Sequence, residues 1–274
     1  MSGGPRKGVH RPLSPARKFV TDLVHFAQQV PTVRVARTMQ VRAVVRAREQ
    51  ATPRPSWSAI FMKAYAMVAV GRPFLRQAFM RWPREHLYEH PFSICAVMIE
   101  REYHGEQIVL GTKIRTPDKA PLTQITRDLD RYKHEPVESL GRYRMALLNG
   151  KLPLPLRRLR WWLTLNVSGY KRCKRLGTFG LTGVGALGAD VDPIGPSTSI
   201  LSPGPVDREG NVRMQVSFDH RVMDAANVAR CLAEMEQFLC GAIVDELTSL
   251  RADASADQTP LRTASRAVLD ANAL

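Results

Sequence analysis

The sequence predicts a mixed α/β protein with a partly antiparallel sheet and flanking helices, and three observations support this fold class. Residues 212–218 alternate apolar and polar side chains, as a strand with one buried face does. A turn-forming stretch, residues 207–211, joins this strand to a β-rich run over residues 198–206. From Asp224 onward, apolar residues recur at the spacing of an amphipathic helix. We expect this helix to pack on the sheet and to end at Gly241.

The rest of the chain supplies further elements of both kinds. Ser14 and Ser56 are good helix N-caps, and Pro15 suits a first helical position. A Tyr-His-Gly turn at residues 103–105 separates two apolar runs that we interpret as paired strands. Helices are expected over residues 14–29, 41–50, 56–70, 122–133 and 142–162, the last broken at Pro153 and Pro155, and strands over residues 33–41, 92–100, 107–114 and 178–182.

Length and composition favour one globular domain. The chain has 274 residues, of which 44% are hydrophobic, so it can bury a large core and is not disordered throughout. Four cysteines are too few for a disulfide scaffold. We expect flexible ends at residues 1–10 and 246–274 and an ordered domain over residues 11–245. No secretory leader or membrane-spanning run is recognisable, which favours a cytoplasmic protein.

The basic excess is the unusual feature of the composition. Forty Lys and Arg face 25 Asp and Glu, a formal charge of +15 that points to an anionic partner. Residues 151–175 concentrate this charge without any acidic residue and contain Trp161 and Trp162. Three interpretations remain open for this segment: an apolar side packed on the fold with arginines in solvent, a site for an anionic thioester, carrier or coenzyme A phosphates, or contact with an anionic membrane surface.

One motif is misleading. Residues 183–188 read GxGxxG and follow a predicted strand, as in dinucleotide-binding folds. That interpretation needs a helix to start here, but Pro193 and Pro196 follow closely, with Gly195 between them. The glycines are better explained by a close approach of backbone to backbone.

The junction between the last strand and the last helix holds a candidate catalytic base. His220 lies between these two rigid elements, with the Asp224 carboxylate four residues later. This arrangement suits a general base whose ring is oriented by its surroundings. The structural alternative is that Asp224 caps the helix and His220 is a hydrogen-bonded loop residue. No further His or Cys falls nearby in the sequence, so no metal site is expected.

Several stretches, in chain order, resemble one protein family. Residues 217–226, SFDHRVMDAA, resemble the DHRxxDG signature of the dihydrolipoyl acyltransferases, the cores of 2-oxo acid dehydrogenase complexes, to which chloramphenicol acetyltransferase is similar. Residues 177–185, GTFGLTGVG, resemble the family's GTFTIS/T-x-x-G stretch, and residues 13–18, LSPARK, resemble its opening helix. Residues 30–33 and 108–129 are similar to further segments. The ordered set covers nearly the whole predicted domain.

The resemblance implies a two-layer α+β fold, a chloramphenicol acetyltransferase-like mixed sheet with flanking helices. It also implies acyl transfer between coenzyme A and a lipoyl or pantetheine-like thiol, without a metal and without a covalent acyl-enzyme. By motif, His220 is the general base for the attacking thiol and Thr182 donates to the tetrahedral oxyanion. Asp224 is expected to hold the orientation of His220, through Arg221.

Substrate and partners also follow from the resemblance. Coenzyme A or acyl-CoA is the expected substrate, with Arg221, Lys174 and Arg175 as its binding residues. The family builds its site between subunits of a trimer, so a homotrimer is expected. A lipoyl domain needs roughly 80 residues, and only about ten precede the match. We therefore expect no lipoyl group on this chain, and an acyl carrier protein acting in trans is one candidate partner.

Two departures from the family pattern leave other functions open. Ala225 replaces the glycine of the motif, and residues 202–204, Ser-Pro-Gly, replace a regular strand segment. A non-catalytic trimeric scaffold of the same fold is the first alternative. A basic protein that binds nucleic acid or a membrane surface is the second, and nucleic acid is not favoured because no known binding motif is present.

Overall fold

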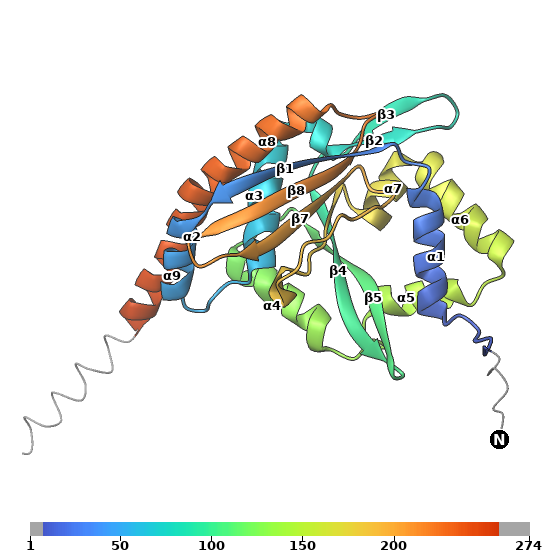
Figure 1. Cartoon of the computed structure of the whole chain (residues 1–274), viewed down its shortest axis with the longest axis horizontal. Helices are drawn as coiled ribbons and strands as arrows, with labels where there is room; N and C mark the ends of the chain where they lie inside the picture. The colour runs from blue at the N-terminus through green and yellow to red at the C-terminus, as the bar shows by residue number, and fades with distance from the viewer. Residues whose placement is uncertain (1–7, 258–274) are drawn as a thin grey trace, which may run out of the picture.

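The computed structural model describes residues 8–257 and is built around a six-stranded mixed sheet (Figure 1). β6 pairs in parallel with β4 and with β7, and the other neighbours are antiparallel. The mixed α/β class predicted from the sequence is confirmed. The strand order is β1-β8-β7-β6-β4-β5, with β1 (Thr32–Gln40), β4 (Ile94–Tyr103), β5 (Glu106–Arg115), β6 (Phe179–Leu181), β7 (Ser199–Val206) and β8 (Asn211–Asp219).

One group of helices covers the face of the sheet to which the apolar residues of β8 point. Along β8 the buried apolar positions are Val212, Met214, Val216 and Phe218, the alternation predicted from the sequence. They form one core with the helices, because each helix buries an apolar stripe against the strands. This group consists of α2 (Arg42–Gln50), α3 (Trp57–Gly71), α4 (Leu122–His134), α8 (Ala225–Phe238) and α9 (Val244–Asp257).

A second group, made of helices and a separate two-stranded hairpin, lies near β5, at the right of Figure 1. α5 and α6 replace the single interrupted helix of the prediction, and Pro155 is accommodated in the first turn of α6. α7 and the two-stranded hairpin were not predicted. The members are α1 (Pro15–Ala27), α5 (Gly141–Gly150), α6 (Leu154–Asn166), α7 (Gly169–Leu176), β2 (Gln77–Met80) and β3 (His86–Glu89). A short 3₁₀ turn, Pro73–Arg76, precedes β2.

The expected end of the last helix at Gly241 is wrong. A π-helical turn, Leu239–Ile243, carries the chain from α8 directly into α9. Leu239, Ile243 and Leu247 are all fully buried in the core, so tertiary packing overrides the low helix propensity of one glycine. The stretch up to Asp257 is therefore helical where a flexible tail was expected. The rest of that tail, residues 258–274, and residues 1–7 lie outside the described part.

The rejection of the dinucleotide motif is confirmed. Only a single 3₁₀ turn, Gly185–Leu187, forms at the GxGxxG stretch. A Cβ on Gly185 would lie 2.9 Å from the carbonyl carbon of Gly204, so the glycine allows the close backbone approach that the sequence suggested. The strand β7 is irregular between Pro203 and Val206, where the sequence departs from the family pattern. Within residues 8–257, no helix is long and apolar enough to cross a membrane.

Candidate active site

The His220 ring is held at the C-terminal end of β8 by backbone groups. The His220 amide donates to the carbonyl of Pro31, which anchors the turn to the start of β1. Nδ1 lies 3.1 Å from the carbonyl oxygen of Met223. A carbonyl oxygen only accepts, so this contact assigns the proton of the neutral ring to Nδ1 and leaves the lone pair on Nε2. The side chain is 48% exposed, so the ring is open to solvent.

Asp224 is a weaker partner of His220 than the sequence suggested. Its Oδ1 lies 3.5 Å from Nδ1, farther than the Met223 oxygen, and its side chain is 74% exposed. It occupies the N-cap position of α8, but its side chain accepts no capping hydrogen bond. The main support of the ring is thus a backbone carbonyl, for which the sequence carries no signal.

Arg221 does not connect Asp224 to His220, which corrects the expected route. Its guanidinium makes two hydrogen bonds, of 2.8 and 2.7 Å, with the carboxylate of Asp219. Asp219 is fully buried, and its carboxylate also accepts from the Arg221 amide, so the pair stabilises the turn that carries His220. The guanidinium also lies over the Phe79 ring, 4.2 Å from its centroid. Asp219, the first residue of the matched motif, is the site-supporting residue that the analysis of the sequence missed.

Thr182 follows β6 and lies in the wall of a cavity. The cavity has a volume of about 550 Å³ and is lined mainly by apolar groups, among them Met98, Ile200 and Ile194. The Thr182 amide donates to the carbonyl of Leu201. Its hydroxyl makes no hydrogen bond with any described residue and is therefore available as a donor.

Within one chain, Thr182 and His220 lie on opposite sides of β7. Thr182 is hydrogen-bonded to Leu201 on one side of β7, whereas Asp219, next to His220, donates to Thr198 on the other side. Three residues along β7 correspond to ~10 Å, and two strand spacings add another ~10 Å across the sheet. The two groups therefore cannot act on the same atom within one chain.

Lys174 and Arg175 lie together on α7, beside a lysine that the analysis of the sequence did not single out. The ammonium of Lys113, on β5, donates to the Lys174 carbonyl. Burial, followed by the charges of Arg142, Arg175 and Lys174, lowers the pKa of Lys113 to about 7. Among the described residues, no hydrogen bond, ion pair or ring contact joins this group to Arg221. The three predicted coenzyme A-binding residues therefore do not form one cluster.

The side chains of α6 correct one interpretation of the basic segment, residues 151–175, namely that its arginines lie in solvent. The guanidinium of Arg157 is buried and forms an ion pair with buried Asp22, at 2.9 Å. The outer surface of α6 is instead apolar, so the expected packing of apolar residues inside and arginines outside is wrong for this helix. Its exposed large side chains are Leu154, Leu156, Leu159, Trp162 and Leu163.

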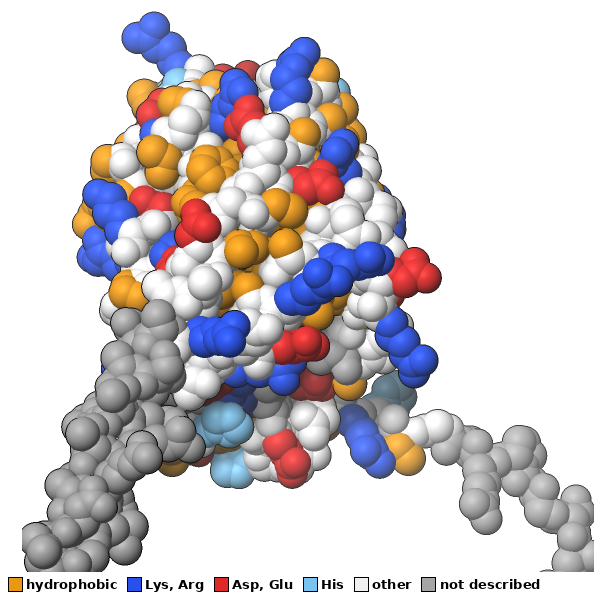
Figure 2. Space-filling model, turned by 90° about the vertical axis from the view of Figure 1, so that its left-hand side faces the viewer, with side chains coloured by type: hydrophobic (Ala, Val, Ile, Leu, Met, Phe, Trp, Pro, Cys, Tyr) orange, Lys and Arg blue, Asp and Glu red, His pale blue; other side chains and the backbone are white. Residues whose placement is uncertain are grey.

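Basic residues are mixed with acidic ones on one side of the molecule and stand without them in one segment of the chain. Figure 2 shows the side of the molecule at the left of Figure 1, where Lys and Arg side chains are dispersed and Asp and Glu lie among them. Residues 139–189 contain ten Lys and Arg and no acidic residue. The segment around α6 and α7 is thus the strongly basic part of the chain, and its two interpretations as a binding surface remain predictions.

Comparison with known proteins by sequence gave no match, neither to a protein-family model nor to a curated protein. Solved structures do match. A probable dihydrolipoamide acetyltransferase from Listeria monocytogenes 4b F2365 is 18% identical, with a TM-score of 0.59 over 88% of this chain and 96% of that chain. The Azotobacter vinelandii dihydrolipoamide acetyltransferase is 16% identical, with a TM-score of 0.61 over 89% of this chain and 100% of that chain.

The chain has the fold of the dihydrolipoamide acetyltransferase catalytic cores. The resemblance found in the sequence is confirmed at this level. A chain from the cubic core of a pyruvate dehydrogenase multienzyme complex is similar too, 15% identical, with a TM-score of 0.60 over 89% of this chain and 100% of that chain. These matches cover 88–89% of this chain, so the matched motifs and the tertiary structure agree on the fold.

Proposed function

We propose that the chain is an acyltransferase that moves an acyl group between coenzyme A, or another thioester carrier, and a thiol or other small acceptor. The observation that carries the proposal is the hydrogen bond from His220 Nδ1 to the Met223 carbonyl, which leaves Nε2 free to accept a proton. The acyltransferase-core fold supports the class of reaction. The available Thr182 hydroxyl supports the second role that acyl transfer needs.

In the proposed mechanism, His220 Nε2 takes the proton of the acceptor thiol. The thiolate sulfur then forms a bond to the thioester carbonyl carbon, and the carbonyl oxygen of the tetrahedral intermediate accepts a hydrogen bond from the Thr182 hydroxyl. When the intermediate collapses, the bond to the original sulfur breaks and the leaving thiolate takes the proton back from the imidazolium. The Met223 carbonyl and Asp224 stabilise the positively charged ring in between.

The site needs two copies of the chain in this proposal. Because ~10 Å along β7 and ~10 Å across it separate His220 from Thr182, we infer that His220 of one subunit faces Thr182 of the next in a homotrimer. The cavity beside Thr182 would then be closed by the neighbouring subunit and hold the acyl chain. The similar chain of the cubic core belongs to a larger assembly, which supports oligomerisation of this fold.

The roles of the three side chains have a counterpart in a similar enzyme. In the A. vinelandii dihydrolipoamide acetyltransferase, the residues investigated for the catalytic mechanism are a serine, a histidine and an asparagine four positions after the histidine. Here Thr182 is a hydroxyl residue like that serine, and Asp224 lies four positions after His220. We propose that Lys174, Arg175 and Lys113 attract the phosphates of coenzyme A, since they form an uncompensated basic group.

An acyl-transfer assay with a panel of acyl-CoA donors and dithiol acceptors tests the reaction. We expect transfer by the full chain and a loss of about 10²–10⁴ in kcat for His220→Ala, the contribution of a general base. The control is His86→Ala, because His86 is an exposed histidine whose Nδ1 also contacts a backbone carbonyl, that of Arg84 at 2.7 Å. Absence of transfer with every donor, from a protein that is trimeric, would contradict the proposal.

Mixed assemblies test the shared site. His220→Ala and Thr182→Val chains should each be inactive alone. Co-expressed, they should regain part of the activity, because an interface between the two variants contains one intact His220 and one intact Thr182. Lack of recovery in mixed oligomers that are confirmed by mass would show that the site lies within one chain.

A further inference from the structure

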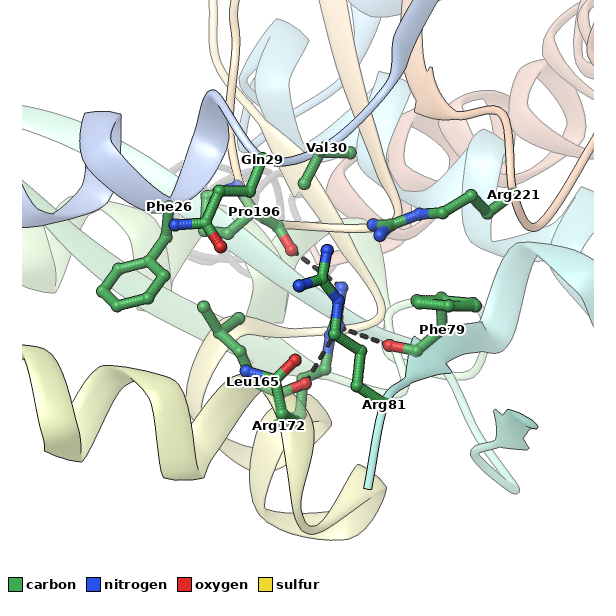
Figure 3. A pocket seen from close by; sticks show the side chains of 10 residues that line it. Phe26, Gln29, Val30, Phe79, Arg81, Leu165, Arg172, Pro196 and Arg221 are labelled. Atoms are coloured by element: carbon green, nitrogen blue, oxygen red, sulfur yellow. Dashed lines mark hydrogen bonds between the residues drawn. The ribbon is translucent and has the colours of Figure 1, made fainter. Parts of the chain in front are cut away.

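A small pocket beside the turn of His220 gathers three arginines (Figure 3). Arg81 follows β2, Arg172 belongs to α7 and Arg221 follows β8, so three separate elements bring them to one wall. Figure 3 shows their guanidinium groups turned toward the same space. Val30 also lines the pocket, next to the Pro31 whose carbonyl binds the His220 amide.

Among the described residues, only one carboxylate forms an ion pair with any of these three guanidinium groups. Arg221 is paired with Asp219. Arg172 is only 5% exposed and donates to the carbonyl oxygens of Phe79, Leu165 and Pro196, at 2.7, 3.1 and 2.9 Å. Carbonyl groups satisfy hydrogen bonds but carry no net charge, so the charge of Arg172 has no ion-pair partner of its own.

Arg81 brings the third positive charge to this pocket. No carboxylate among residues 8–257 forms an ion pair with it, and no hydrogen bond of its side chain occurs there. Burial is the main cause that lowers the pKa of Arg172 to about 10, and the charge of Arg221 lowers it further, while Asp219 opposes this shift. Within residues 8–257, no carboxylate forms an ion pair with Arg172, so its buried charge carries a desolvation cost.

We propose that this pocket binds a small oxyanion, a carboxylate or phosphate group, with Arg81 and Arg221 as its principal donors. A planar guanidinium matches two oxygens of such a group, and a bound anion would neutralise the excess charge. The pocket has a volume of about 30 Å³ and is partly open to solvent, a size that suits one small anionic group and not a whole nucleotide. Gln29 and Asn166 also line the pocket, and their side-chain amides donate to the carbonyls of His25 and Trp162, at 3.5 and 2.9 Å, with a second N–H left on each.

Calorimetric titration of the full chain with inorganic phosphate, and separately with succinate, tests the pocket at low ionic strength. We expect saturable binding that Arg81→Met weakens about tenfold or more, since a charge-assisted contact is lost. Arg46→Met is the control, because Arg46 is exposed on α2, away from the three arginines. Equal binding by both variants, or no binding by the unmodified chain, would overturn the proposal. Arg81 is exposed and unpaired, so its replacement should leave the fold intact, which thermal unfolding checks.

A second measurement distinguishes a free anion from an anionic group of the substrate, and this part rests on the proposed acyl transfer. If the pocket holds such a group, acceptors or acyl chains with a terminal carboxylate should react with a lower KM than neutral analogues, and Arg81→Met should abolish the difference. Equal KM values, with phosphate binding intact, would assign the pocket to a separate anion. Phosphate binding without any transfer would leave the pocket standing and contradict only the proposed reaction.

Discussion

The two groups of helices around the sheet are stabilised by different kinds of contact. α3 buries apolar side chains along most of its length and α8 buries an apolar stripe, for example Phe61, Tyr65 and Leu232; the buried charge on α3 is Lys63, which pairs with Glu246. α6 and α7 instead bury Arg157 against Asp22 and Arg172 against backbone carbonyls. On α6 most of the large apolar side chains are exposed, whereas Leu165 is buried.

These two kinds of contact hold the helices in place in different ways. Apolar burial is non-directional and stabilises the first group through many small contributions. A buried ion pair is directional: it contributes little beyond its own desolvation cost, but removing one partner leaves an unpaired charge in the interior. The α6–α7 region should therefore depend on a few polar residues, and its outer surface should contribute little to folding.

Breaking the Asp22–Arg157 pair should give the largest effect. Asp22→Ala leaves the Arg157 guanidinium buried without its carboxylate, which typically costs about 3–5 kcal/mol. The measurement is the free energy of unfolding in urea. Glu135→Ala, which removes the exposed partner of Arg131, is the control and should cost about 0–1 kcal/mol. If Asp22→Ala cost no more than this control, the buried pair would not stabilise the region.

Matched leucine substitutions sharpen the contrast between α8 and α6. Leu232→Ala, at a side chain 1% exposed, should cost about 2–5 kcal/mol through lost burial and a cavity. Leu159→Ala, at a side chain 52% exposed, should change the free energy of unfolding by about 0.5 kcal/mol or less. Urea denaturation of each variant, under the same conditions as the unmodified chain, measures both changes in the free energy of unfolding. A cost at Leu159 as large as that at Leu232 would contradict the outward orientation of α6.

Lys113 should give the smallest effect, and one that depends on pH. Its folded pKa, about 7, lies below its ordinary value of 10.5, so between these values the unfolded chain binds a proton that the folded chain lacks. The stability of the unmodified chain should therefore rise with pH in this window, and below pH 7 the full cost of burying the charge remains.

Lys113→Met removes this cost. The variant should be more stable than the unmodified chain below pH 7, and its advantage should shrink as the pH rises toward 10. Urea unfolding at pH 6, 8 and 9.5 measures the trend, with exposed Lys119→Met as the control. An advantage that does not change with pH would show that the Lys113 amine is not desolvated.

Local patterns were sufficient for much of the fold. The alternation of residues 212–218, the turn before them and the amphipathic helix after Asp224 all appear as predicted. The hairpin of β2 and β3 was missed, because its strands have only four residues each and offer little periodicity. The end at Gly241 was wrong, since burial of Leu239 and Ile243 outweighs a propensity of ~1 kcal/mol.

The class of fold, the order of the main strands and helices, and His220 as the candidate base could be predicted from residue patterns, because these depend on spacing along the chain. Three features of the site came from the folded chain alone: the Met223 carbonyl holds the His220 ring, Asp219 pairs with Arg221, and β7 separates Thr182 from His220. The inward turn of Arg157 was decided there too. The Met223 contact uses a backbone group, and the Asp22–Arg157 and Leu201–Thr182 contacts join residues far apart in the chain, so residue types carry no local signal for them. Asp219 and Arg221 are only two residues apart, but their pairing depends on the conformation of the turn.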